Sequence, residues 1–119
     1  MLIYIDSDAV RMRVHRKLLV QSFPWLSVRC FDRWESGILD GVPSDRVVYV
    51  FTCLDDLTEA EMNAIISSAR AEHPGLRWFA LWAHDLSVPD WVAGLEPESV
   101  LGLPLDVHAI KRHLKHVAK

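Results

Sequence analysis

The stretch VVYVF, residues 47–51, indicates the fold of this chain more clearly than any other segment. It contains only β-branched and aromatic residues, which is typical of a central strand covered on both faces of a parallel sheet. A little further on, Thr58 and Glu61 have the spacing of a capping box and predict the start of a helix. The residues of that helix expected to face inward are Met62, Ile65, Ile66 and Ala69.

The N-terminal segment repeats the order of strand and then helix. Residues 2–5, LIYI, are typical of a buried strand, and Asp8 is a suitable N-cap for a helix that follows. In that helix Val10, Val14 and Leu18 recur every four residues. We therefore expect these three side chains to face the sheet.

Further alternations complete the pattern. Strands are predicted at residues 26–31, 76–83 and 99–101, and helices at residues 88–95 and 105–117. Between the second and third strands, Asp32 is expected to cap a short, weakly helical piece that Gly37 and Gly41 limit. Strands separated by helical crossovers form parallel sheets with right-handed connections. The sequence therefore predicts an α/β fold, a three-layer α/β/α sandwich with a five-stranded parallel sheet and flavodoxin-like topology. We expect residues 1–119 to form a single domain.

Composition narrows the class of protein. Of 119 residues, 50% are hydrophobic and 24% are charged, and the formal net charge is -3, which is ordinary for a globular domain. The two cysteines, Cys30 and Cys53, are expected to be reduced. No apolar run is long enough to span a bilayer, and the first residues do not resemble a signal peptide. These features predict a cytoplasmic protein that inserts into no membrane.

Three features of the layout resemble a known family. Acidic residues follow the first predicted strand at once, strands and helices alternate five times, and Pro104 comes just after the fifth strand. This layout resembles the receiver domains of bacterial two-component response regulators. The resemblance implies a phosphorylation switch: an acidic pair holding Mg²⁺, an aspartate at the end of the third strand that accepts the phosphoryl group, a Ser or Thr ending the fourth strand, and a lysine before the proline.

The first and third of these positions depart from the family pattern. Asp6 fits the first acidic position, but Ser7 stands where the second carboxylate is usual, and Asp8 is displaced by one residue. The acceptor position is expected between Val50 and Thr52, a window that contains no carboxylate. Since a neutral hydroxyl forms no acyl phosphate, Thr52 does not replace the missing aspartate.

The other positions depart as well. Trp82 stands where the hydroxyl is expected, and Leu103 precedes Pro104 where the lysine is expected. Asp55 and Asp56 come three or more residues too late to serve as acceptor and are expected to be solvated acids before the next helix. The predicted pocket is thus a degenerate receiver site made of Asp6, Ser7, Asp8, Thr52, Trp82, Leu103 and Pro104. Mg²⁺ is not expected there, and Asp6 and Asp55 are weak candidates for holding one.

Tryptophans and basic residues suggest a contact surface. Five tryptophans are many for this length, and some are expected to reach the surface. The candidate partner-binding face comprises Trp78, Trp91, Lys111, Arg112 and Lys115. Two alternatives stay open: the tryptophans cover the sheet, and the basic residues coat the solvent side of an amphipathic last helix.

These patterns predict an atypical receiver-like signalling domain. It would act through contact with a protein partner or a second copy, without conventional aspartyl phosphorylation, enzymatic activity, cofactor or direct binding of nucleic acid. An alternative is the N-terminal receiver portion of a two-component transcription regulator, whose DNA-binding output domain is not in this chain. A third hypothesis is a metal-dependent hydrolase that uses Asp6, Asp8, Asp55 and His84.

Overall fold

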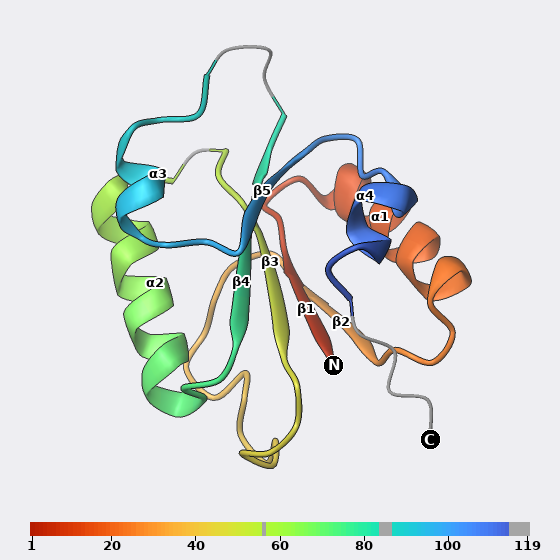
Figure 1. Cartoon of the computed structure of the whole chain (residues 1–119), viewed down its shortest axis with the longest axis horizontal. Helices are drawn as coiled ribbons and strands as arrows, with labels where there is room; N and C mark the ends of the chain where they lie inside the picture. The colour runs from red at the N-terminus through yellow and green to blue at the C-terminus, as the bar shows by residue number, and fades with distance from the viewer. Residues whose placement is uncertain (56, 84–86, 115–119) are drawn as a thin grey trace.

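Five parallel strands form one sheet in the computed structural model, which describes residues 1–55, 57–83 and 87–114. The strands are β1 (Leu2–Ile5), β2 (Val28–Phe31), β3 (Tyr49–Cys53), β4 (Arg77–Trp82) and β5 (Ser99–Gly102). Their order across the sheet is β2-β1-β3-β4-β5 (Figure 1). The predicted three-layer α/β fold with flavodoxin-like topology is confirmed.

The central strand is β3, which pairs with β1 on one side and β4 on the other. All five of its residues are buried, as the run of apolar residues predicts. The strand begins at Tyr49, two residues later than the run itself, because Val47 is 42% exposed before the chain enters the sheet. This shift places Cys53, and not Thr52, at the end of β3.

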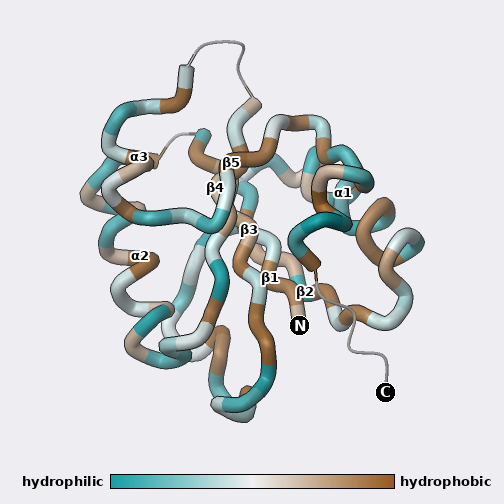
Figure 2. The backbone as a smooth tube through the Cα atoms, in the orientation of Figure 1, coloured by the Kyte–Doolittle hydropathy of each residue, from teal (hydrophilic) through white to brown (hydrophobic). Residues whose placement is uncertain are grey.

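Helices cover both faces of the sheet (Figure 1). The first layer contains α1 (Ala9–Ser22) and α4 (Val107–Lys111), and the second contains α2 (Glu59–Glu72) and α3 (Trp91–Gly94). Each layer closes its own apolar core, one around Leu19, Phe51 and Ile110 and the other around Val50 and Met62. In Figure 2 apolar residues dominate the central strands, while polar and apolar residues alternate along the helices. None of the helices in the described part of the chain is long and apolar enough to cross a membrane.

Helix α2 matches its sequence pattern. The capping box is present, with the Glu61 backbone N–H donating to the Thr58 side chain and the Glu61 side chain accepting from the Thr58 N–H. Its buried residues are Met62, Ile66 and Ala69. The last two helices, α3 and α4, are shorter than predicted, although residues 115–117 of the predicted last helix lie outside the described residues. The short helical piece predicted after Asp32 is wrong, since the described segment between β2 and β3 forms turns.

Helix α1 contradicts its sequence pattern. Val10 is 69% exposed and Val14 is 60% exposed, so the prediction that these two face the sheet is wrong. Leu18 is half-buried and packs against the core, as predicted. The buried residues of this helix are His15 and Leu19. Residues four apart share a helix face, and Val10 and Val14 each precede one of Arg11 and His15 by one residue, so pointing the polar pair at the sheet turns the valines about 100° away from it. The polar contacts of these two residues, described below, explain that choice.

The candidate contact face also needs correction at one position. Trp78 is 1% exposed and belongs to the core beneath α2, so it does not contribute to an exposed face. Its neighbour on the same side, Trp91, is half-buried and packs against that core. Lys111 and Arg112 are exposed, and Lys115 lies outside the described residues. Trp25 is 40% exposed, as expected for some of the tryptophans.

Candidate functional site

The site lies at the carboxyl ends of β1 and β3, where the order of strands reverses. From β1 the chain crosses to β2 on one side, and from β3 it crosses to β4 on the other. In open parallel sheets such a reversal leaves a crevice above the strand ends. Here Asp6 follows β1 directly, Cys53 ends β3, and Asp55 lies two residues further on.

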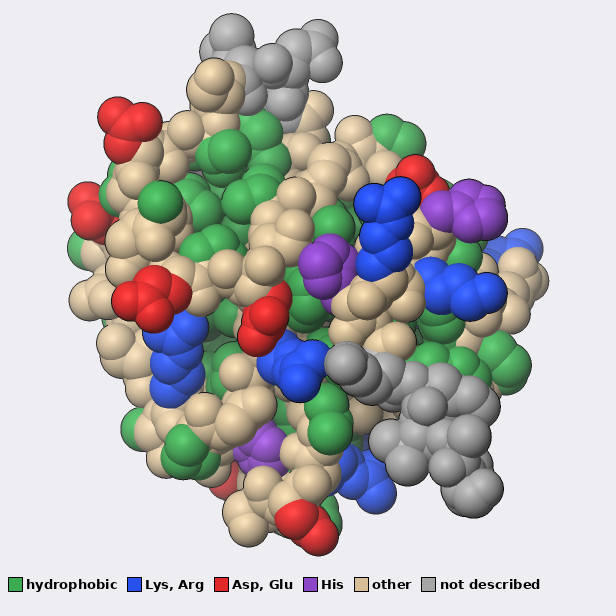
Figure 3. Space-filling model, viewed as in Figure 1, with side chains coloured by type: hydrophobic (Ala, Val, Ile, Leu, Met, Phe, Trp, Pro, Cys, Tyr) green, Lys and Arg blue, Asp and Glu red, His purple; other side chains and the backbone are tan. Residues whose placement is uncertain are grey.

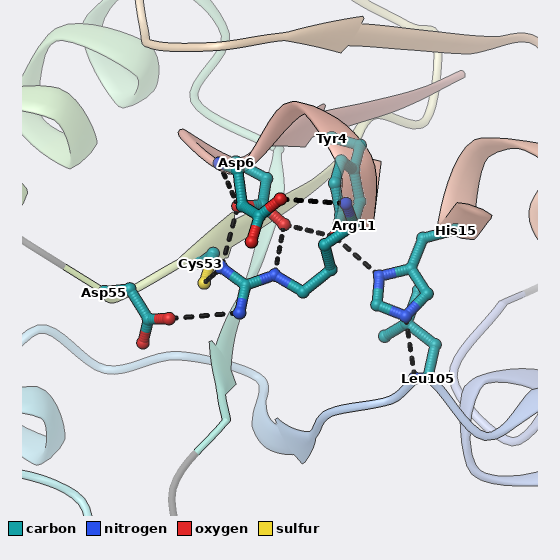
Figure 4. A network of polar contacts seen from close by, with 8 residues as sticks. Tyr4, Asp6, Arg11, His15, Cys53, Asp55 and Leu105 are labelled. Atoms are coloured by element: carbon teal, nitrogen blue, oxygen red, sulfur yellow. Dashed lines mark hydrogen bonds and ion pairs between the residues drawn. The ribbon is translucent and has the colours of Figure 1, made fainter. Parts of the chain in front are cut away.

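The guanidinium of Arg11 is bound between these residues (Figure 4). Its Nε donates to Asp6 Oδ2 at 2.7 Å, and its Nη2 donates to Asp6 Oδ1 at 2.8 Å, so the pair is bidentate. Its Nη1 donates to Asp55 Oδ2 at 3.0 Å. Planar two-point pairing of this kind is the strongest geometry for an arginine and a carboxylate. Arg11 thus bridges the ends of β1 and β3 with a fixed positive charge.

Burial makes this ion pair more important than a surface pair. The Asp6 side chain is 0% exposed and that of Arg11 is 20% exposed. Burial opposes ionisation of Asp6, but hydrogen bonds from Arg11, the Asp8 N–H and Tyr4 hold its pKa below the usual value. The hydrogen bonds to Asp6 raise the pKa of Arg11, so the cation is permanent.

Cys53 stands at the end of β3 on the same side of the sheet as Asp6. Arg11 Nη2 lies 3.0 Å from its Sγ. Burial raises the pKa of the Cys53 thiol to about 11, so the sulfur is neutral at physiological pH. Thr52 points to the opposite side, because side chains alternate along a strand. It is fully buried, and among the described residues its hydroxyl has no hydrogen-bond partner.

A second set of hydrogen bonds supports Asp6 from behind (Figure 4). The Leu105 backbone N–H donates to His15 Nε2 at 3.3 Å, so this nitrogen carries no proton. His15 Nδ1–H then donates to the Tyr4 hydroxyl at 2.8 Å, and that hydroxyl donates to Asp6 Oδ2 at 2.8 Å. The relay therefore joins the loop after β5 to the carboxylate after β1.

The relay requires a neutral histidine and a neutral tyrosine. Burial lowers the pKa of His15, which is 3% exposed. Burial and the neighbouring Asp6 raise the pKa of Tyr4. Both shifts favour the protonation states that the hydrogen bonds need, so the polar core of the site is internally consistent.

The other predicted pocket residues take different places. Ser7 and Asp8 are exposed, and the Asp8 side chain accepts from the Arg11 backbone N–H, so it caps α1. Trp82 is half-buried at the end of β4. Leu103 and Pro104 line an apolar groove of about 360 Å³ along α1, together with Arg11, Val14, His15 and Ala83. The structure therefore brings Asp6 and Ser7 together with Cys53 and Asp55 around one pocket of about 300 Å³, and leaves Asp8 outside it.

The residues present do not fit a Mg²⁺ ion. Magnesium requires oxygen ligands with free lone pairs in octahedral geometry. Both oxygens of Asp6 accept from Arg11, and the position beside it is the exposed Ser7. Within residues 1–55, 57–83 and 87–114, no group of three His, Cys, Asp or Glu side chains is arranged to hold a metal.

The hydrolase hypothesis gains no support from this geometry. Arg11 engages Asp6 and Asp55, and Asp8 serves as a helix cap. The remaining candidate, His84, lies outside the described residues.

Four residues of the site escaped the sequence analysis: Tyr4, Arg11, His15 and Cys53. Arg11 and His15 are four apart in α1, the spacing that places two side chains on one helix face. The neighbouring Val10 and Val14 have the same spacing, so the pattern alone does not decide whether the polar pair or the valine pair faces the sheet. Only the position of Asp6 at the end of β1 distinguishes the two, because a buried carboxylate needs a partner.

Comparisons with known proteins agree with this fold. No protein-family model matches the chain, and no curated protein matches it. Among solved structures, a response regulator receiver protein from Burkholderia phymatum is similar, with 19% identity and a TM-score of 0.66. The match covers 94% of this chain and 89% of that one.

Two further structures have the same architecture. A protein provisionally described as pilus assembly-related, from Burkholderia pseudomallei K96243, matches with 20% identity and a TM-score of 0.69, over 94% of this chain and 84% of that one. RcsB from Salmonella enterica serovar Typhimurium, bound to promoter rprA, matches with 16% identity and a TM-score of 0.64, over 93% of this chain and 64% of that one. The fold of the present chain is therefore that of a response-regulator receiver domain.

Proposed function

We propose that this chain is a receiver-like signalling module that acts by binding other protein chains and is not switched by aspartyl phosphorylation. The observation that carries the proposal is the Arg11 guanidinium, which is hydrogen-bonded to both Asp6 and Asp55. An internal cation there supplies the counter-charge that a divalent ion supplies in a phosphorylated receiver. The carboxylates of Asp6 and Asp55 are therefore already paired with a cation that belongs to the chain itself.

The end of β3 supports the same proposal. Formation of an acyl phosphate requires a carboxylate nucleophile. Cys53 occupies the last position of β3, is 4% exposed, and has a thiol whose pKa is raised by burial. Asp55 lies beyond the strand and accepts from Arg11. Attack by either residue on a phosphoryl donor would require the Arg11 contact to break.

The surface near the site supports a role in binding. Val10 and Val14 are large apolar residues exposed on α1. The groove lined by Val14, Leu103 and Pro104 continues this apolar surface toward the loop after β5. Exposed apolar area next to a groove marks a contact site more often than a free surface. Lys111 and Arg112, at the end of the neighbouring helix α4, are exposed and add positive charge to this layer of the molecule.

The test uses Mg²⁺ with acetyl phosphate or with beryllofluoride, which mimics the acyl phosphate. We expect no phosphorylated product by intact mass and no change in tryptophan fluorescence, in the wild type or in Asp6→Asn. A fluorescence change in the wild type that Asp6→Asn abolishes would restore a phosphorylation switch. Ser7→Asp/Arg11→Ala/Cys53→Asp is the positive control, because it removes the Arg11 cation, supplies a second acid beside Asp6 and places a carboxylate at the end of β3.

A second candidate is the receiver portion of a transcription regulator. The structure of RcsB bound to promoter DNA favours it, since this chain matches only 64% of that longer chain. Attachment of a DNA-binding domain after residue 119 would let partner contact at α1 control binding of DNA. Sequencing of the reading frame beyond Lys119 tests this: an in-frame DNA-binding segment supports it, and a stop codon contradicts it.

A further inference from the structure

Charge is divided between the two helical layers. Helix α1 contains four Arg and Lys residues and no acidic one, and α4 ends at Lys111 and is followed by Arg112. On the other layer α2 contains Glu59, Glu61 and Glu72, with Arg70 as its basic residue, and acids flank α3. Figure 3 shows acidic side chains gathered over α2 and α3 and a group of basic side chains over α1 and α4, with further basic side chains elsewhere on this face. The two sides of the molecule are electrostatically complementary.

The basic side carries an exposed apolar ridge. We define the α1 ridge as Val10, Arg13, Val14 and Lys17, which recur at three and four residues and share one helix face. Val10 is 69% exposed and Val14 is 60% exposed, and Arg13 and Lys17 are also exposed. The ridge therefore presents two branched apolar side chains between two cations.

The acidic side carries an apolar groove. We define the α3–β5 groove as a depression of about 490 Å³ whose apolar lining includes Val88, Pro89, Val92 and Val100. Asp90 and Glu96 also line it, and both are exposed. Val100 is 38% exposed on β5, which is an edge strand of the sheet.

The basic side chain of Arg70 on α2 reaches the border of this groove at Glu96. It donates to the backbone carbonyls of Leu95 and Glu96 at 3.3 Å. Its charge is thus engaged with the main chain below the groove, while the Glu96 side chain remains exposed. The groove keeps an acidic border around an apolar floor.

We infer that the α1 ridge of one copy docks into the α3–β5 groove of a second copy, head to tail. This inference rests on the proposed binding role of α1 and names its partner. The two valines would enter the apolar groove, while Arg13 and Lys17 would face Asp90 and Glu96. Opposite charges on either side of an apolar contact fix the orientation in which two proteins bind.

Symmetric pairing is disfavoured by the same charges. If two ridges faced each other, the cations Arg13 and Lys17 of one copy would repel those of the other. If two grooves faced each other, the carboxylates of Asp90 and Glu96 would repel each other in the same way. The ridge and the groove lie on opposite layers of the sheet, so one copy can engage two neighbours at once. A contact between two different surfaces continues from copy to copy, and it yields short chains whose length rises with protein concentration.

The first measurement is sedimentation velocity of the wild type over roughly 1–300 µM protein, since association of this kind depends on concentration. We expect the average mass to rise across this range at about 0.01 M salt. Affinity should fall about tenfold at about 1 M salt, where the Debye length shrinks from roughly 30 Å to 3 Å. A monomer at every concentration in low salt would overturn the inference, while the phosphorylation test above would stand unaffected.

Charge reversal then distinguishes head-to-tail from symmetric docking. The ridge variant is Arg13→Glu/Lys17→Glu, and the groove variant is Asp90→Lys/Glu96→Lys. All four side chains are exposed, so folding should be retained, and circular dichroism and thermal unfolding verify this. Each variant alone should be monomeric, because its reversed surface repels the normal surface of the next copy.

An equimolar mixture of the two variants should associate again with an affinity within about tenfold of the wild type, since each ridge then meets a groove of opposite charge. The variant carrying all four changes should also self-associate. A mixture that stays monomeric, or single variants that associate as well as the wild type, would overturn the head-to-tail arrangement. The matched control is Arg29→Glu/Arg46→Glu, which reverses basic charge at two exposed positions outside both the ridge and the groove and should leave association largely unchanged.

Discussion

Helices α1 and α2 are both 14 residues long and pack on opposite faces of the same sheet, yet their buried faces differ: that of α1 combines the polar His15 with Leu19, and that of α2 is apolar. Helix α2 buries Met62, Ile66 and Ala69 and exposes its polar residues. Helix α1 points Arg11 and His15 at the sheet and exposes Val10 and Val14.

The difference teaches that two kinds of interaction orient helices in this fold. Burial of apolar side chains orients α2, whose capping box also fixes its start. Pairing of a buried carboxylate orients α1, because Asp6 at the end of β1 would be very costly without Arg11. Exposed valines on α1 are then a consequence, and they are available for contact with another chain.

The largest expected effect comes from removing the cation of α1. Arg11→Met should lower the free energy of unfolding by about 4 kcal/mol at pH 7, because it leaves Asp6 buried without its partner. Urea denaturation measures the change. Arg13→Met, an exposed arginine of the same helix, is the control and should change stability by less than about 0.5 kcal/mol. Equal effects of the two variants would mean that the ion pair does not orient α1.

A somewhat smaller effect is expected in the core of α2. Met62 is 0% exposed, so Met62→Ala should cost about 3 kcal/mol through lost burial and a residual cavity. The exposed Asn63 beside it offers a control, since Asn63→Ala should be nearly neutral. A loss below about 1 kcal/mol for Met62→Ala would show that the α2 layer is not held by its core.

The relay behind Asp6 predicts a dependence on pH. His15 has an unfolded-state pKa of 6.5 that burial lowers in the folded state. Below pH 6.5 the unfolded chain binds a proton that folded His15 does not, so stability falls as pH falls, by at most about 1.4 kcal/mol per pH unit. Above pH 6.5 His15 is neutral in both the folded and the unfolded chain, so it no longer makes stability depend on pH.

Urea denaturation between pH 5 and 8 measures this slope. His15→Gln should flatten it, and His108→Gln, at an exposed histidine, should leave it unchanged. Loss of the slope in His108→Gln and not in His15→Gln would contradict the assigned hydrogen bonds.

The smallest expected effect is at the valines of α1. Val14→Ala should change stability by less than about 0.5 kcal/mol and in the stabilising direction, because alanine has the higher helix propensity and Val14 buries little. Thermal unfolding of a dilute sample, where copies do not associate, is the measurement. A loss of about 2 kcal/mol would place Val14 in the core of the isolated chain and remove it from the proposed contact surface.

Much of the fold was predictable because it depends on local patterns. The run at residues 47–51 predicts a buried central strand, and Thr58 with Glu61 predicts the start of α2, since both depend on near neighbours in sequence. The face of α1 was not predictable in this way. It depends on Asp6, which lies on a different element and becomes buried only when the sheet forms.

The site was predictable only in part. Asp6 was identified from its place after β1, and the absence of an acceptor carboxylate in β3 was anticipated. The contact of Arg11 with Asp55 spans 44 residues of sequence, and that of His15 with Leu105 spans 90. The spacing of residues within one helix or strand gives no information about contacts between residues so far apart in sequence. The end of β3 was misplaced by one residue for the same reason, since the register with β1 decides which side chain faces Asp6.

The most direct test of the account is the Arg11 side chain itself. In a ¹⁵N-resolved NMR spectrum the Arg11 Nε–H should give a resolved signal that exchanges slowly with water, because it donates to a buried carboxylate. We predict that Asp6→Asn removes this protection and that millimolar Mg²⁺ with beryllofluoride leaves the wild-type signal unchanged. Displacement of the wild-type signal by Mg²⁺ and beryllofluoride would contradict the account, because it would show that the guanidinium yields its place to a metal and a phosphoryl group.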